Sequence, residues 1–233
     1  MHAKTHNDRV MVFYPSQLFH IYNQGNNRRQ IFFTEENYRF FLWKVRAYLL
    51  PFGDLAAWCL MPNHFHWLFY VKQVEIERKH LWQHIDEVEY LRRVKKYGVK
   101  AQPVKRDHTR ISKESKPITL NEAIGALQSA YTRALNKERG WTGSLFREKA
   151  KAKDGWIDEF VCVDMRNRQS NHCFLPGADY AYQCFCYIHD NAKEAGLVKD
   201  NIDWPYSSAR DYAGLRKGTL CNLKMGREIM DYL

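Results

Sequence analysis

The stretch DLAAWCLMPNHFHWLFYV, residues 54–71, consists of two apolar and aromatic runs joined by a short Met-Pro-Asn connection. Each run has the length of one β-strand, and proline and asparagine favour a tight turn between strands. We therefore expect two adjacent antiparallel strands, at 54–60 and 64–71. The second strand carries two histidines, His64 and His66, within a run that otherwise has the composition of a protein interior.

Helical and strand patterns occur on both sides of this predicted hairpin. Apolar side chains recur at helical spacing in two segments, which follow the potential capping residues Thr34 and Thr119. A charged segment from Val74 and a segment that ends before Gly196 are also typical of helices. Alternation typical of a strand is found near the N-terminus and again in GSLFREKAKAKD. The predicted elements outside the hairpin are strands at 18–23 and 143–154 and helices at 35–50, 74–97, 120–139 and 179–195.

The order of the elements indicates the class of fold. With the helix at 74–97 assigned to an insertion, the order is strand, helix, two strands, helix, strand and a further helix. It predicts an α+β fold, namely a ferredoxin-like split βαββαβ antiparallel sheet with helices on one face, plus an added C-terminal helix. We expect a single domain over 1–233, with a basic helical or loop insertion at about 73–117 and an extended C-terminal tail at about 197–233.

The composition limits the partners and the compartment. The 233 residues include 36 Lys and Arg against 26 Asp and Glu, which gives a formal charge of +10 at pH 7. Such a charge favours a polyanionic partner, nucleic acid first, although solubility alone can also account for it. No apolar run is long enough to span a bilayer, so we expect a cytoplasmic protein with no membrane partner. The six cysteines lack a CxxC pair, which argues against a zinc ribbon.

The two histidines of the second strand can act together. Alternate side chains of a strand point to the same face, so His64 and His66 can converge on one cation. The same spacing also occurs by chance on a hydrated sheet face. The HxH spacing therefore defines a candidate metal site, and the alternative of a structural pair stays open.

Three segments extend this pattern beyond the histidine pair. AAWCLMPNHFHWLFYV, the preceding IYNQGNNRRQIFF and the later GSLFREKAKAKD resemble, in order and spacing, the single-tyrosine transposases of the His-hydrophobic-His (HUH) endonuclease superfamily. The resemblance is greatest to the REP-associated tyrosine transposase (RAYT) branch, and it extends from about Leu18 to Tyr212 without the basic insertion. It implies a bacterial enzyme that acts on single-stranded or hairpin DNA and is nucleoid-associated when bound to DNA.

The resemblance also implies a nucleophilic tyrosine on a late helix, followed one turn later by a third metal ligand. The segment CYIHDNAKEAGLV, residues 186–198, supplies Tyr187 and Asn191 at these positions. The family pattern resembles Tyr-Ile-x-x-Asn-Pro-Val-x-x-Gly-Leu-Val, and Ala192 stands where proline is usual. Residues four apart lie on the same helix face, so Asn191 can reach a cation while Tyr187 lies beside it.

Together these residues predict a metal-dependent tyrosine transposase that cleaves and rejoins DNA. A divalent cation, Mg²⁺ or Mn²⁺, held by His64, His66 and Asn191 would polarise a phosphodiester. Tyr187 would attack the phosphorus, form a 5′-phosphotyrosine link and release a 3′-hydroxyl. Two other classes stay open: a vestigial or domesticated structured nucleic-acid-binding protein, and a zinc hydrolase whose activity would not depend on Tyr187.

Basic side chains in three segments are candidates for phosphate contacts. They lie in the turn after the first predicted strand, in the helix at 74–97 and along one face of the strand at 143–154, where lysines can instead protect a sheet edge. Monomer and homodimer both remain open, and Tyr187 can serve its own metal site or a partner's. The candidate nucleic-acid-binding residues are Arg28, Arg29, Arg92, Arg93, Lys95, Lys96, Arg147, Lys149, Lys151 and Lys153.

Overall fold

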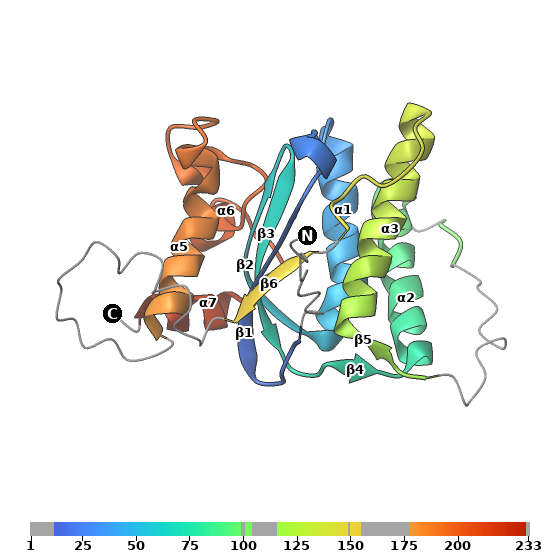
Figure 1. Ribbon diagram of the computed structural model, residues 1–233, viewed down its shortest axis with the longest axis horizontal. Helices are drawn as coiled ribbons and strands as arrows, with labels where there is room; N and C mark the ends of the chain where they lie inside the picture. The colour runs from blue at the N-terminus through green and yellow to red at the C-terminus, as the bar shows by residue number, and fades with distance from the viewer. Residues whose placement is uncertain (1–11, 99–100, 104–115, 149, 155–177, 232–233) are drawn as a thin grey trace, which may run out of the picture.

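A computed structural model describes residues 12–98, 101–103, 116–148, 150–154 and 178–231. A four-stranded antiparallel sheet lies at the centre, with helices on both of its faces (Figure 1). The prediction of an α+β fold built on an antiparallel sheet is therefore confirmed. The strands, in spatial order, are β2 (Gly53–Met61), β3 (His64–Val71), β1 (Gln17–Gln24) and β6 (Lys151–Asp154).

The register of the sheet brings the polar positions of β1 and β3 together. β2 and β3 form the predicted hairpin, joined by a two-residue Pro-Asn turn. β1 pairs with the other side of β3 and aligns Tyr22 with His66 and Gln24 with His64. Because directly opposed residues share a face of the sheet, these four side chains point to the same side.

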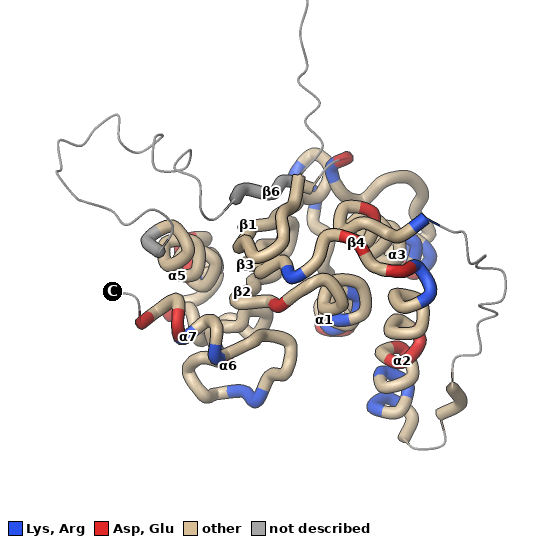
Figure 2. Tube along the Cα trace, turned by 90° about the horizontal axis from the view of Figure 1, so that it is seen from below, with Lys and Arg blue, Asp and Glu red and all other residues tan. Residues whose placement is uncertain are grey.

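Three helices lie on one side of the sheet, as Figures 1 and 2 show from two directions. Two of them begin at the predicted capping residues, Thr34 and Thr119, and each of these forms a capping box with the residue three positions later. Their apolar faces pack on an aromatic core that includes Phe41, Phe65 and Trp67, all fully buried. The helices are α1 (Glu35–Leu49), α2 (Arg78–Tyr97) and α3 (Leu120–Arg139). Strand β4 (Glu75–Ile76) precedes α2 and strand β5 (Ile118–Thr119) precedes α3 in the sequence, and the two pair as a small antiparallel ribbon.

A second core occupies the opposite face of the sheet. Helix α5 (Ala178–Glu194) packs there against β2, next to α7 (Leu223–Asp231) (Figure 1). Many side chains at this contact are small, which lets the helix approach the strands closely. The buried residues of this second core include Ala56, Ala57, Cys59 and Leu68 from the sheet and Ala181, Cys184, Ile188 and Ala192 from α5.

The last strand of the sheet is shorter than the predicted 143–154. Only Lys151–Asp154 forms β6, while the preceding connection makes an isolated bridge between Gly25 and Phe146. Leu145 and Phe146 are adjacent and both buried, which departs from the alternation of a strand that is exposed on one side. The apolar pair therefore anchors a connection and does not extend the strand.

The segment after Gly196 differs from the extended tail that was expected. It contains two short helices, Asn201–Asp203 (3-10) and α6 (Ala209–Tyr212), before α7. The backbone N–H of Leu60 donates to Tyr206 O at 2.8 Å, and that of Ser208 donates to Trp58 O at 2.9 Å. These bonds cover the outer edge of β2, which would otherwise leave strand N–H and C=O groups unpaired. In the described part of the chain, no helix has both the length and the apolar character needed to cross a membrane.

Candidate active site

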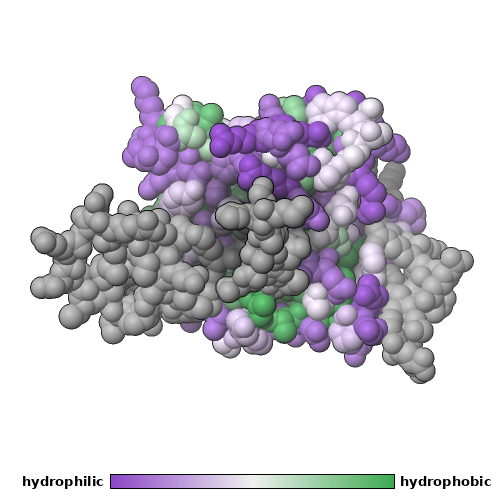
Figure 3. Space-filling view, in the orientation of Figure 1, coloured by the Kyte–Doolittle hydropathy of each residue, from purple (hydrophilic) through white to green (hydrophobic). Residues whose placement is uncertain are grey.

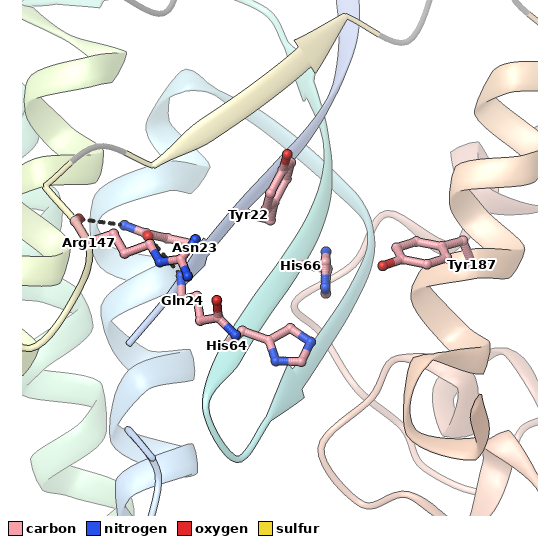
Figure 4. A pocket seen from close by; sticks show the side chains of 7 residues that line it. All are labelled: Tyr22, Asn23, Gln24, His64, His66, Arg147 and Tyr187. Carbon is pink, nitrogen blue, oxygen red and sulfur yellow. Dashed lines mark hydrogen bonds between the residues drawn. The ribbon is translucent and has the colours of Figure 1, made fainter. Parts of the chain in front are cut away.

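A pocket of about 210 Å³ opens between the sheet and α5 (Figure 4). Its described lining comes from β1, β3, α5 and the connection that precedes β6. The lining is aromatic, amide and basic, and it includes no carboxylate among the described residues. The lining residues are Tyr22, Asn23, Gln24, His64, His66, Arg147 and Tyr187.

The two histidines of the HxH spacing lie side by side in this pocket. Their ring centroids are 5.0 Å apart and the ring planes are perpendicular. Burial lowers the pKa of His64, and the nearby side chain of Asn191, whose oxygen favours the protonated ring, opposes this shift only in part. Burial, with the nearby imidazoles of His20 and His64, lowers the pKa of His66 well below its usual value. Both rings are therefore neutral at pH 7 and can offer a lone pair to a cation.

His64 lies between two amide oxygens. Its Nδ1 is 2.6 Å from Oδ1 of Asn63, and its Nε2 is 3.2 Å from Oδ1 of Asn191. A neutral imidazole carries one N–H and can donate to only one of these acceptors. Two lone pairs repel each other most strongly at short range, so the N–H is expected in the shorter contact, the one between Nδ1 and Asn63. Nδ1 therefore donates to Asn63, and Nε2 presents its lone pair to the oxygen of Asn191.

A cation between Nε2 and Oδ1 would replace this repulsion by attraction. Two ligands about 2.1 Å from one ion in adjacent octahedral positions are about 3.0 Å apart, and the observed separation is 3.2 Å. Among the described residues, no three His, Cys, Asp or Glu side chains gather into a metal-binding group. The set of His64, His66 and Asn191 therefore fits a divalent cation through two imidazoles and an amide, without a carboxylate.

Tyr187 lies beside the imidazoles on α5. Its ring centroid is 5.4 Å from that of His66, the residue is 52% exposed, and in Figure 4 its oxygen points toward His66. Asn191 follows one turn later, and its Nδ2 is 3.5 Å from the carbonyl oxygen of Tyr187. Ala192, at the position where the family pattern has proline, is fully buried in the second core. One chain therefore brings the phenol, the amide and both histidines into one site.

β1 adds a third histidine that sequence reasoning did not consider. Nε2 of His20 is 2.9 Å from Nδ1 of His66, and His20 is only 3% exposed. Its ring centroid is also 5.8 Å from that of Tyr187. The alternation of the predicted strand puts His20 on the same face as Tyr22, which was the available signal. The register that aligns this face with β3 could not be predicted from the sequence.

His189 follows Tyr187 by two residues, and helical geometry turns it about 200° around α5, away from the tyrosine. It is buried, and its Nε2 is 2.7 Å from Oγ of Ser208. Burial lowers its pKa to about 4. The ring is therefore a neutral packing group between α5 and the C-terminal segment.

The predicted basic row of the last strand is only partly described. Arg147 lines the pocket, and its backbone N–H donates to Gln24 O at 2.9 Å. Lys149 and the side chains of Lys151 and Lys153 lie outside the described residues. The backbone register pairs Lys151 with Tyr22 and Lys153 with His20.

Arg28 and Arg29 lie in the turn after β1 and do not line the pocket. Nδ2 of Asn63 donates to the backbone oxygen of Arg28 at 3.2 Å, which ties this turn to the residue before His64. The guanidinium carbon of Arg29 is 5.1 Å from the ring centroid of Trp141, within cation–π range. Hydrophilic residues gather around this upper end of the molecule in Figure 3.

The basic residues of α2 lie away from the imidazoles, on the other side of the sheet (Figure 2). Arg92 pairs with Glu89 at 2.6 Å, and Arg93 reaches the same carboxylate at 4.0 Å. Lys96 is 3.6 Å from Glu36. Arg92, Lys95 and Lys96 line a separate groove of about 770 Å³ between α1, α2 and the C-terminal segment. The four basic candidates of α2, which are Arg92, Arg93, Lys95 and Lys96, therefore do not line the pocket that contains the imidazoles.

No protein-family model matches the sequence. No curated protein matches it. A solved structure described as "Structure of the REP associates tyrosine transposase bound to a REP hairpin" is similar to this chain, with 14% sequence identity and a TM-score of 0.46. The match covers 89% of this chain and 86% of that one.

Proposed function

We propose that this chain is a metal-dependent, transposase-type endonuclease and strand transferase for single-stranded DNA, acting at or near hairpins. The observation that carries the proposal is that Tyr187 and the two imidazoles line one pocket of one chain, with Asn191 in contact with His64. The residue patterns that resemble the RAYT branch of the HUH superfamily agree with it. The strand order β2-β3-β1-β6 supports a ferredoxin-like split βαββαβ arrangement, with the tyrosine on the added helix α5.

The proposed metal ligands are His64, His66 and Asn191. Mg²⁺ and Mn²⁺ are both compatible with this set, and Mn²⁺ accepts imidazole nitrogen more readily. When bound, such a cation would polarise the scissile phosphate and offset the charge that develops on its oxygens. The protein contributes the alignment, because the lone pair of His64 and the oxygen of Asn191 already point toward each other.

Tyr187 is the proposed nucleophile. Its oxygen would form a bond to phosphorus while the bond from phosphorus to the 3′-oxygen breaks, which yields a 5′-phosphotyrosine link and a free 3′-hydroxyl. The phenol proton passes to solvent, and the departing 3′-oxygen takes up a proton. Attack of another 3′-hydroxyl on the link would reverse the step, so the ester bond is conserved for strand transfer. The exposure of Tyr187 supports this role, because a phosphodiester must reach the phenol.

Arg147 is the basic residue with the strongest case for contact with the reacting strand, since it lines the same pocket. The remaining basic candidates would bind the phosphates of flanking DNA through charge, and such contacts do not distinguish one base sequence from another. The chemistry requires no partner subunit, because the described pocket draws its histidines and its tyrosine from one chain.

The deciding experiment compares two tyrosines of the same pocket. A labelled single strand with a hairpin, incubated with Mn²⁺ or Mg²⁺, should yield an SDS-stable protein–DNA adduct and a free 3′-hydroxyl fragment. Tyr187→Phe should abolish the adduct, while Tyr22→Phe, the matched control, should retain it. Hydrolysis that survives Tyr187→Phe would indicate a zinc hydrolase. Tight hairpin binding without an adduct for wild type would instead favour a vestigial or domesticated binding protein.

A further inference from the structure

The His20–His66 contact joins a proposed metal ligand to a second buried imidazole. Nε2 of His20 lies 2.9 Å from Nδ1 of His66, so the hydrogen bond occupies one ring nitrogen of the ligand. The other nitrogen, Nε2 of His66, makes no hydrogen bond within the part of the chain that the structure describes. Of the two nitrogens of His66, only Nε2 is therefore placed to bind a cation.

The direction of this hydrogen bond decides whether His66 can act as a ligand. If Nδ1 of His66 carries the proton, it donates to His20, and Nε2 keeps its lone pair for a cation. In the opposite direction, Nε2 of His20 donates to Nδ1 of His66. The single proton of a neutral His66 ring is then on its Nε2, which cannot bind a cation. His64 has the first arrangement, because its Nδ1 donates to Asn63 and its Nε2 faces Asn191. The two rings would thus present the same nitrogen to one ion.

We infer that His20 is a positioning residue, which accepts the Nδ1–H hydrogen bond of His66 and thereby keeps Nε2 of His66 aimed at the cation. This inference rests on the proposed function, since it assumes that His66 is a metal ligand. The packing supports it, because the ring of Tyr22 lies 5.2 Å from that of His20 and 5.7 Å from that of His66. The three rings restrict one another, and partners of this kind commonly orient metal-binding imidazoles.

The first test reads the position of the proton without metal or DNA. Long-range ¹H–¹⁵N NMR spectra of the metal-free protein at neutral pH distinguish the two tautomers of an assigned histidine. The expected spectrum of His66 has a protonated Nδ1 and an unprotonated Nε2. A spectrum with the proton on Nε2 of His66 overturns the inference, whether or not the protein cleaves DNA.

The second test compares two replacements of His20. The side-chain amide of Gln can place an acceptor near the position of the histidine Nε2, whereas Phe keeps a ring without a nitrogen. Mn²⁺ titrations followed by electron paramagnetic resonance should show affinity weakened about 10- to 100-fold in His20→Phe and within about threefold of wild type in His20→Gln. Metal-free thermal unfolding checks that both variants fold.

Three results of the titration would count against His20 as a positioning residue. The first is a His20→Phe variant that binds Mn²⁺ as tightly as wild type. The second is an equal loss in His20→Gln and His20→Phe, which would indicate packing alone. The third applies if His20→Phe does not fold: the His20→Gln variant then binds Mn²⁺ far more weakly than wild type. Failure of the proposed function has a different signature, namely no DNA adduct from wild type while the Mn²⁺ affinities and the tautomer follow the inference.

Discussion

Nε2 of His64 lies 3.2 Å from Oδ1 of Asn191, although 127 positions separate the two residues in the chain. The contact connects the central strand β3 to α5 at the point where Tyr187 faces the pocket. It is therefore a link between two layers of the fold and, in the proposed function, a pair of lone-pair donors for one ion. Changes at Asn191 test these two roles separately.

Replacement of Asn191 should alter metal affinity according to the oxygen that remains. Asn191→Ala removes a ligand oxygen, so the Mn²⁺ dissociation constant should rise about 10- to 100-fold. Asn191→Asp keeps an oxygen and adds charge, so it should bind at least as tightly as wild type. Isothermal titration calorimetry without DNA measures both. Equal affinities for wild type and Asn191→Ala would remove Asn191 from the ligand set.

Arg147 should contribute one phosphate contact at the pocket. Arg147→Ala is expected to weaken binding of a hairpin-bearing strand and to reduce the slope of log K against log salt by about 1. Arg133→Ala on α3 is the matched control, because Arg133 is exposed and does not line the pocket. Fluorescence anisotropy over a series of salt concentrations gives both slopes. The same slope for the two variants would argue against a phosphate contact by Arg147.

Asp211 should stabilise the C-terminal segment that covers β2. Its carboxylate is buried and accepts hydrogen bonds from Arg216 at 2.7 and 2.8 Å and from the backbone N–H of Gly218 at 3.1 Å. Asp211→Asn should lower the free energy of unfolding by on the order of 2–4 kcal/mol, since Arg216 loses its charged partner but is partly exposed. Urea unfolding measures the change. Asp203→Asn, at an exposed carboxylate, should change little.

Glu89 should make stability depend on acid pH. Burial alone would raise the pKa of Glu89, but its hydrogen bond from Arg92 and the charges of Lys44 and Arg93 outweigh burial and lower it. A folded-state pKa below the unfolded value means that protonation favours the unfolded chain. The stabilisation is thus present above the unfolded pKa of about 4.3 and is lost as pH falls through the folded pKa.

Glu89→Gln tests this dependence. The variant should be less stable than wild type at pH 7, and the difference in unfolding free energy should narrow as the pH falls below about 4. Urea unfolding over a range of pH measures it, with Glu87→Gln at an exposed position as control. A difference between wild type and Glu89→Gln that does not change with pH would show that the ion pairs of Glu89 carry no such linkage.

The parts of the fold that follow from local pattern could be predicted from the sequence. The hairpin of β2 and β3 follows from two apolar runs and a short turn, and the helical capping boxes follow from side chains three residues apart. The common face of Tyr187 and Asn191 likewise depends only on helical geometry. These features need no knowledge of which distant segments meet.

The rest depended on packing between distant segments. His20 reaches His66 only through the register of β1 on β3, and 46 positions separate the two residues in the chain. The burial of Leu145 and Phe146 shortens β6, because both side chains enter the core. The C-terminal segment reads as polar and extended, yet the backbone of Tyr206 and Ser208 completes the edge of β2.

The second core has a consequence for how the reaction geometry is set. Small side chains, among them Ala57 on β2 and Ala181 on α5, determine how near the helix lies to the strands. The gap between the phenol of Tyr187 and the imidazoles is thus fixed by residues behind the pocket that never meet a substrate. Adding a few methyl groups to this buried layer would move the proposed nucleophile, Tyr187, away from the sheet while leaving every side chain of the pocket unchanged, so the alignment of the site can be altered without a change in its chemical groups.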